Sequence, residues 1–180
     1  FETEWGFSCM GYEISGALGI KMAKPDQDVV VFVGDGSYLL NNSDIYSSVL
    51  YDQKLSIIVC DHGGHMVINR LQLAKGGKEY ICNLRAARAT NLQFVDFENH
   101  AKSMGANAET VSSTSELEAA FKRAKDSDKT YVIAIKTHGY EWLEGTAFWE
   151  SPTLQDPITE DNKKALNDFE SGKNKQRKGV

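Results

Sequence analysis

The sequence predicts an α/β fold with a doubly wound, mainly parallel sheet and helices on both faces. Three short apolar runs, at residues 29–33, 55–60 and 131–135, have the length and composition of buried strands. Segments with apolar residues at helical spacing separate these runs. Strands that alternate with helices in this way form parallel sheets with right-handed crossovers.

The first predicted helix covers residues 10–23, where apolar side chains recur at helical spacing. Pro25 ends this helix, and the first strand follows at residues 28–33. We expect the buried face of the helix to carry Met10, Ile14, Ala17, Leu18 and Met22.

A second helix is predicted up to about Tyr51, with Asn42 or Ser43 as its N-cap. The next strand covers residues 55–60 and ends in a polar turn that contains two glycines, at residues 61–65. We expect the second helix to bury Ile45, Val49 and Leu50.

The apolar residues lose their regular spacing between Met66 and about Arg88. We expect a lid or binding loop in this stretch, around residues 75–78. A helix ending at Gly105 and a strand at residues 108–111 follow. Residues 113–116 have the sequence of a capping box. The helix that this box begins is expected to bury Leu117, Ala120, Phe121 and Ala124.

The chain is expected to have two parts, a binding domain at residues 1–137 and an arm packed on it at residues 138–180. Three aromatic residues would pin the arm, and the basic end at residues 173–178 would be solvated and frayed. These aromatic residues are Trp142, Phe148 and Trp149. Because the chain begins at Phe1 rather than Met, we expect it to be a piece of a longer protein.

Composition argues against two classes of partner. A net charge of -5 without a concentrated basic face disfavours nucleic acid. No apolar run approaches the roughly 20 residues of a membrane span, so no membrane partner is expected. The three cysteines lack metal-ligand spacing, and we expect reduced, buried thiols in a cytoplasmic protein.

Asp35 lies between two glycines at the end of the first strand. Ligands of open α/β sheets bind at the carboxyl ends of the strands. His62 follows the next strand, 27 positions later, so one ligand could touch both turns. A carboxylate beside bare backbone suits a divalent cation and a phosphate group.

Other interpretations stay open at this point. Gly-Asp-Gly also occurs in hairpins, where Asp35 would be a turn or cap carboxylate. His62 and His65 would then be solvated loop residues, and Met10 would be a core residue.

Residues 34–37, followed after about 25 residues by a polar pair and a glycine, resemble the thiamine-diphosphate motif of the acetolactate synthase and pyruvate decarboxylase superfamily. The resemblance implies that Asp35, His62 and the Gly64 carbonyl bind the Mg²⁺ that anchors the cofactor's diphosphate. The family has asparagine where this chain has His62, and imidazole suits softer metals than Mg²⁺. The cofactor contacts that the resemblance implies in these turns are Gly34, Gly36, Ser37, Gly64 and His65.

Residues 6–13 lie where this superfamily contacts the pyrimidine ring of the cofactor. By that resemblance Met10 is the apolar wedge that bends the cofactor, and Ser8 offers a carbonyl group to the aminopyrimidine. Residues 6–13, residues 34–39 and the tail after Tyr131 resemble in particular the trihydroxycyclohexane-1,2-dione hydrolases of myo-inositol catabolism. Residues 1–137 would then bind thiamine diphosphate and magnesium in an enzyme that opens a cyclic 1,2-dione at a carbon-carbon bond.

The resemblance covers only the carboxyl-terminal third of such an enzyme. The catalytic glutamate of the superfamily lies on a separate pyrimidine-binding domain, so we expect no catalytic residue in this chain and no activity from it alone. The parent enzyme is expected to act on a small molecule and to be at least a homodimer. Two alternatives are an acetolactate synthase-like or 2-keto acid decarboxylase of the same superfamily, and a non-catalytic nucleotide-binding or assembly module.

Overall fold

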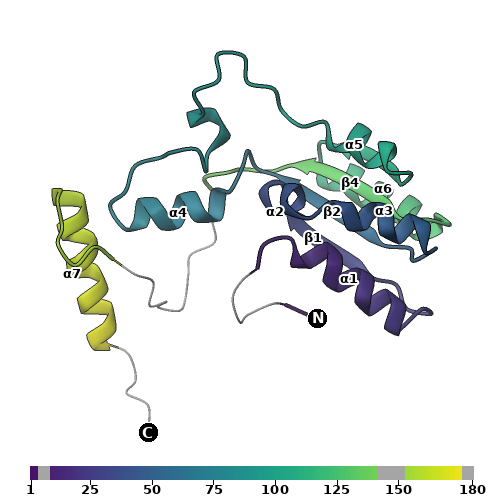
Figure 1. Cartoon of the computed structure of the whole chain (residues 1–180), viewed down its shortest axis with the longest axis horizontal. Helices are drawn as coiled ribbons and strands as arrows, with labels where there is room; N and C mark the ends of the chain where they lie inside the picture. The colour runs from purple at the N-terminus through teal and green to yellow at the C-terminus, as the bar shows by residue number, and fades with distance from the viewer. Residues whose placement is uncertain (4–8, 142–152, 176–180) are drawn as a thin grey trace, which may run out of the picture.

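A parallel sheet of four strands forms the centre of the computed structural model, which describes residues 1–3, 9–141 and 153–175 (Figure 1). The strands are β1 (Val30–Gly34), β2 (Ser56–Asp61), β3 (Asn107–Val111) and β4 (Tyr131–Lys136). Their order in the sheet is β1-β2-β4-β3. Ser56 lies opposite Val30 on one side and opposite Tyr131 on the other, so the strands begin at a common edge.

Helices cover both faces of this sheet, which confirms the predicted fold class. The described helices are α1 (Tyr12–Ala23), α2 (Asp35–Leu40), α3 (Ser43–Leu50), α4 (Met66–Ala74), α5 (Phe97–Ser103), α6 (Thr114–Asp126) and α7 (Glu160–Lys175), with a short 3₁₀ helix at Leu84–Ala86. Of these, α4 and α7 lie away from the sheet and belong to neither of its two cores (Figure 1). Residues of α1, α2, α3 and α5 form one core with Val31 and Val33. Residues of α6 form a second core with Val111 and Ile133. Successive strand residues point to opposite faces, so the two cores lie on opposite sides of the sheet.

The first helix is confirmed, but its predicted buried face is partly wrong. Ile14, Ala17 and Leu18 are buried, whereas the side chains of Met10 and Met22 are 44% and 57% exposed. Met10 precedes the helix, which begins only after Gly11 in the left-handed conformation. Met22 lies in the last turn of α1, beyond the central turns that contact the core.

The segment after β1 contains two helices rather than one. Gly34 is the N-cap of the six-residue helix α2, so the expected tight turn is the start of a helix. Asn42 precedes α3 without a capping hydrogen bond from its side chain. Ile45 is buried as expected, but the Leu50 side chain is 60% exposed. Val49 is only half-buried.

The helix α4 was not predicted, because its apolar residues surround the helix instead of marking one face. Met66 is buried, whereas the side chains of Val67 and Ile68 are 55% and 40% exposed. The loop expected at residues 75–78 does follow this helix, and Gly76 there has a positive φ of 75°.

The helix α7 in the arm was also not predicted. Asn162 Nδ2 donates to the Gly76 carbonyl at 2.9 Å, which places the start of α7 beside the loop after α4. The helix continues through Lys175, into the stretch expected to be frayed. The three aromatic residues expected to pin the arm fall at residues 142–152, outside the described residues. The division of the chain at residue 137 stays a prediction.

The predicted capping box is largely confirmed, whereas the expected burial of the cysteine thiols is wrong, since Cys9 is exposed. Ser113 Oγ accepts from the Glu116 N–H at 3.2 Å and begins α6, while the Glu116 carboxylate bonds Ser112 N–H at 2.7 Å rather than the Ser113 N–H. None of the three cysteines, all of them described, forms a disulfide. Cys60 and Cys82 are only partly buried, and burial raises the pKa of the Cys60 thiol.

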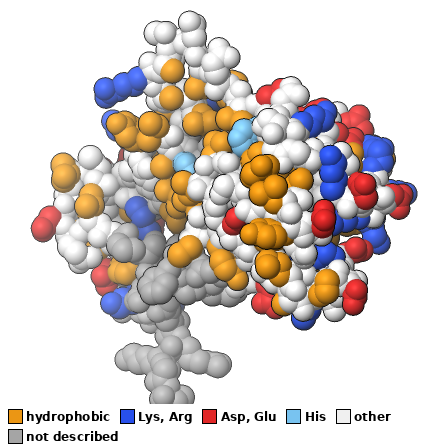
Figure 2. All heavy atoms as spheres, turned by 45° about the vertical axis from the view of Figure 1, so that its right-hand side comes forward, with side chains coloured by type: hydrophobic (Ala, Val, Ile, Leu, Met, Phe, Trp, Pro, Cys, Tyr) orange, Lys and Arg blue, Asp and Glu red, His pale blue; other side chains and the backbone are white. Residues whose placement is uncertain are grey.

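The surface carries charges of both signs. Figure 2 shows basic and acidic side chains intermixed on the face that it presents, in keeping with a net charge of -5. No helix in the described part of the chain combines the length and hydrophobicity that a membrane span requires.

Thr130 provides a test of the packing between β4 and the neighbouring elements. Its side chain is 1% exposed, and its Oγ1 accepts from the Leu55 N–H at 3.1 Å and is bonded to Ser48 Oγ at 2.7 Å. Thr130→Val keeps the shape of the side chain but removes the hydroxyl that bonds the Leu55 N–H and Ser48 Oγ. The substitution should lower the free energy of unfolding by about 1–3 kcal/mol. Urea denaturation measures this loss, with exposed Thr90→Val as the control. Equal stability of the two variants would contradict the assignment.

Candidate functional site

Asp35 is a buried carboxylate at the junction of two turns. It is the first residue of α2, directly after β1, and only 2% of it is exposed. Its Oδ2 accepts hydrogen bonds from the Gly63 and Gly64 N–H groups at 2.9 Å and 2.6 Å. The turn after β2 therefore wraps around the carboxylate that follows β1, at the carboxyl edge of the sheet.

His62 contacts the other oxygen of this carboxylate. His62 Nδ1 lies 2.8 Å from Asp35 Oδ1, and the imidazole is 19% exposed. Burial alone would raise the pKa of Asp35, but the His62 contact and the two backbone N–H groups outweigh it and leave that pKa below its ordinary value. The contact with Asp35 in turn raises the pKa of His62 despite the opposing effect of burial. Each side chain thus favours the charged form of the other.

The two facing atoms would fit a divalent cation once the cation displaces the proton from His62 Nδ1, because only the neutral imidazole nitrogen binds metals. Asp35 Oδ1 and His62 Nδ1 are both buried, and neither has a hydrogen bond of good alignment with any described residue. Two ligands about 2.1 Å from one ion, at right angles, lie about 3.0 Å apart, close to the observed 2.8 Å. The described residues hold no group of three or more His, Cys, Asp or Glu side chains suited to a metal. A cation here would therefore need backbone, water or ligand oxygens as well.

A small cavity of about 40 Å³ adjoins Asp35, although His62 does not line it. Asp35, Gly36, Gly64 and His65 line it together with Leu39, Asp61, Leu84, Phe94, Val95 and Phe97. A Cβ atom at Gly36 would collide with His65 Nδ1, which is buried and has no hydrogen-bond partner in the described part of the chain. His65 also precedes α4, and the N–H groups at the start of a helix attract anions.

The remaining residues of the sequence prediction lie in different places. Gly34 approaches the same pair, since a Cβ atom there would lie 2.9 Å from His62 Nε2. Ser37 is 9% exposed in the first turn of α2. Met10 is exposed and does not line the cavity, and Ser8 lies outside the described residues.

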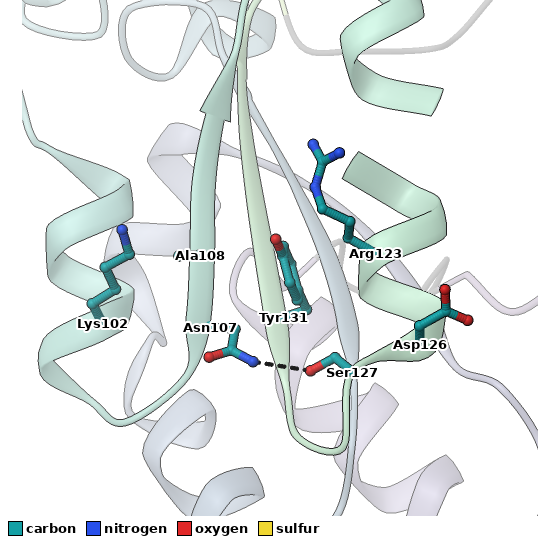
Figure 3. A pocket seen from close by; sticks show the side chains of 7 residues that line it. All are labelled: Lys102, Asn107, Ala108, Arg123, Asp126, Ser127 and Tyr131. Carbon is teal, nitrogen blue, oxygen red and sulfur yellow. Dashed lines mark hydrogen bonds between the residues drawn. The ribbon is translucent and has the colours of Figure 1, made fainter. Parts of the chain in front are cut away.

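A larger hollow of about 400 Å³ lies at the opposite edge of the sheet, where β3 and β4 begin. Figure 3 shows its lining, including the hydrogen bond from Asn107 to Ser127. The basic groups there already have partners, since Lys102 pairs with Glu98 and Arg123 with Glu109, both at 2.6 Å. The carboxyl edge at Asp35 is therefore the better candidate, although its cavity is smaller.

The segment that supports the turn after β2, residues 61–65 and here called the second turn, was not predicted. Residues 82–84 run beside this turn, and Asn83 forms an isolated antiparallel bridge with Gly64. Figure 1 shows the long excursion after α4 that carries this segment and rises above the carboxyl end of the sheet. No apolar periodicity marks a single bridge, so the sequence offered no signal for it.

The chain matches a known family over most of its length. Residues 1–135 match the model of the family described as thiamine pyrophosphate enzyme, C-terminal TPP binding domain. A 3D-(3,5/4)-trihydroxycyclohexane-1,2-dione hydrolase from Halalkalibacterium halodurans is 39% identical over 147 residues, which are 78% of this chain and 23% of that protein. The enzyme of the same name from Lacticaseibacillus casei is 33% identical over 178 residues, 96% of this chain and 27% of that protein.

A solved structure shows the same fold. It is the thiamine diphosphate-dependent 4-hydroxybenzoylformate decarboxylase of Rhodococcus jostii RHA1, with a TM-score of 0.60 and 23% identity, covering 72% of this chain and 23% of that one. The chain spans about a quarter of the length of these relatives. With the family match covering residues 1–135, the resemblance inferred from the sequence is confirmed, and the chain belongs to the family of C-terminal TPP-binding domains of thiamine pyrophosphate enzymes.

Proposed function

We propose that this chain is the cofactor-binding part of a thiamine-diphosphate-dependent hydrolase that opens a cyclic 1,2-dione in inositol catabolism. The observation that carries the proposal is the convergence of Asp35 and His62 at the carboxyl edge of the sheet, 2.8 Å apart. The family match supports the cofactor, and the names of relatives at 33–39% identity support the substrate class.

Some residues of the two turns would bind the cation, and others would contact the cofactor. Asp35, His62 and the Gly64 carbonyl would bind a divalent cation, Mg²⁺ in the simplest case. The groups proposed to contact the cofactor are Gly34, Gly36, Ser37, Gly64 and His65, with Ser8 and Met10 at its pyrimidine end. When bound, the cofactor supplies the chemistry of carbon-carbon bond cleavage, while this chain positions its diphosphate.

The proposal includes a partner. A pyrimidine-binding domain of the same enzyme would complete the site and carry the catalytic glutamate, and the enzyme would be cytoplasmic and at least a homodimer. Residues 1–137 would form the binding domain and residues 138–180 its arm. The relatives are about four times as long as the matched segment, which leaves room for such a domain in proteins of this kind.

Substrate turnover by the complete protein tests the proposal. We expect hydrolysis of the cyclic 1,2-dione that depends on thiamine diphosphate, and no consumption of pyruvate. Pyruvate consumption without activity on the dione would reject the hydrolase in favour of a decarboxylase or acetolactate-forming enzyme. Binding of adenine nucleotides without thiamine diphosphate would instead indicate a non-catalytic module.

Because His62 offers a nitrogen ligand, we expect the site to have an unusual metal preference. Asparagine would replace the imidazole nitrogen near Asp35 with an amide oxygen, which Mg²⁺ prefers. We expect His62→Asn to tighten Mg²⁺-dependent binding of thiamine diphosphate and to lower the preference for Mn²⁺ over Mg²⁺, each by about tenfold. Titration calorimetry with each metal measures both effects.

The control for this substitution is His138→Asn, which changes a histidine whose side chain is 79% exposed and not part of the site. It should leave both affinities unchanged. An unchanged or weaker Mg²⁺-dependent affinity in His62→Asn would show that His62 does not face the cation.

A further inference from the structure

Glu79 is the centre of a polar cluster next to the candidate site. In the loop after α4, its Oε1 accepts hydrogen bonds from Asn69 Nδ2 at 2.9 Å and from Tyr140 OH at 2.7 Å. Its Oε2 accepts from Asn83 Nδ2 at 3.3 Å. Asn69 and Asn83 are only 1% and 4% exposed, so this carboxylate provides acceptors for two buried amides.

The donors and acceptors of this cluster form a closed triangle. Asn83 Nδ2 donates to both Glu79 and Tyr140 OH, the latter at 2.6 Å, and Tyr140 OH donates to Glu79. Glu79 is the member of the triangle that only accepts, a task that suits an ionised carboxylate. The hydrogen bonds from Tyr140 and Asn69 hold the pKa of Glu79 below its ordinary value.

The triangle connects to the second turn through the backbone at Asn83. Asn83 is bridged to Gly64, and hydrogen bonds of 2.8 Å and 3.0 Å on either side join residues 82 and 84 to residues 65 and 63. The Gly63 and Gly64 N–H groups in turn bind Asp35. A displacement of Asn83 would therefore change the direction of both N–H groups.

Asn69 provides a second connection from Glu79 to the same turn. Its backbone N–H donates to the His65 carbonyl at 2.9 Å in the first turn of α4, and its side chain donates to Glu79. The carboxylate thus holds the second turn from the bridging segment on one side and from the helix on the other.

We propose that Glu79 is a positioning residue that holds the Gly63–Gly64 turn on Asp35 through Asn83 and Asn69, and so sets the affinity of the site for its cation and diphosphate. The part about cation and diphosphate depends on the function proposed above. The part about the turn depends only on the contacts of Glu79.

Two substitutions test the proposal on the protein in solution. Glu79→Gln turns one of the two acceptor oxygens into a donor, and Glu79→Ala removes both. We expect the Gly63 and Gly64 amides to exchange with solvent at least about tenfold faster in Glu79→Ala, with a smaller increase in Glu79→Gln. Amides of α6 and the midpoint of urea denaturation should stay nearly unchanged. Binding of thiamine diphosphate with Mg²⁺ should weaken by about tenfold.

Glu118→Gln, an exposed substitution on α6, is the matched control and should change none of these quantities. Unchanged exchange at Gly63 and Gly64 in Glu79→Ala would overturn the proposal, as would an equal acceleration of all amides, which indicates general destabilisation. Local acceleration in a protein whose wild type binds no thiamine diphosphate would support the role of Glu79 in the turn and reject the proposed cofactor.

Discussion

Replacing Asp35 by asparagine should abolish cation-dependent binding of thiamine diphosphate while leaving the fold in place. The asparagine carbonyl can still accept from the Gly63 and Gly64 N–H groups, which now bond Asp35 Oδ2. The amide nitrogen would face His62 in place of a charged ligand atom. Since even indirect partners of a metal change affinity by about 10–100-fold, loss of this direct ligand should cost roughly 100-fold or more.

Titration of Mn²⁺ and Mg²⁺ by calorimetry, with and without thiamine diphosphate, measures this loss. Circular dichroism during thermal unfolding should show a nearly unchanged fold, and Asp128→Asn, at an exposed loop position, should bind as the wild type does. Full metal affinity in Asp35→Asn would mean that the carboxylate is only a cap for the second turn.

Gly64→Ala should have the largest effect on stability among the substitutions in the site. Gly64 has φ +125°, which side-chain-bearing residues rarely adopt, and a Cβ atom there would lie 2.5 Å from the Cys82 carbonyl oxygen. Both the strain and the collision displace the N–H group that bonds Asp35. We expect a loss of about 3 kcal/mol or more in the free energy of unfolding, together with loss of cation binding.

Gly63→Ala separates these two causes. Gly63 also has a positive φ, +92°, but a Cβ atom there would meet no atom of the described residues within 4 Å. It should therefore cost only the strain, about 1–2 kcal/mol. If urea denaturation gives the same loss for both variants, the close approach of Cys82 to the turn does not contribute.

The sheet was predictable because its central strands β2 and β4 are largely buried on both faces. The edge strand β1 was expected to be buried as well, but one of its faces is open, with Val30 and Phe32 40% and 66% exposed. Short continuous apolar runs such as residues 55–60 are typical of strands that helices cover on both sides, and the polar turns after them identify the functional edge. The predicted meeting of Asp35 and His62 follows from the parallel topology alone, because one crossover returns the chain to the same edge.

The missed helices lack the signal on which the sequence prediction depends. The apolar residues of α4 are mostly exposed. In α7, the buried residues among those that the structure describes are Asn162 and Ala165. Their positions depend on contacts such as that of Asn162 with Gly76, 86 residues apart, which local periodicity does not contain.

The polar cluster around Glu79, next to the site, could not be predicted from the sequence either. Glu79, Asn83 and Tyr140 are polar residues with no regular spacing, and only the folded excursion after α4 brings them together. Met10 shows the opposite error, since its helical spacing with Ile14 suggested burial, yet the helix begins after it.

Calorimetric titration of thiamine diphosphate into the complete protein, with Mg²⁺ or with a chelator, tests the central claim most directly. We expect binding that requires the cation and that disappears in Asp35→Asn. Binding of equal strength in the chelator, or an undiminished affinity in Asp35→Asn, would contradict a cation-anchored diphosphate at the carboxyl edge of this sheet.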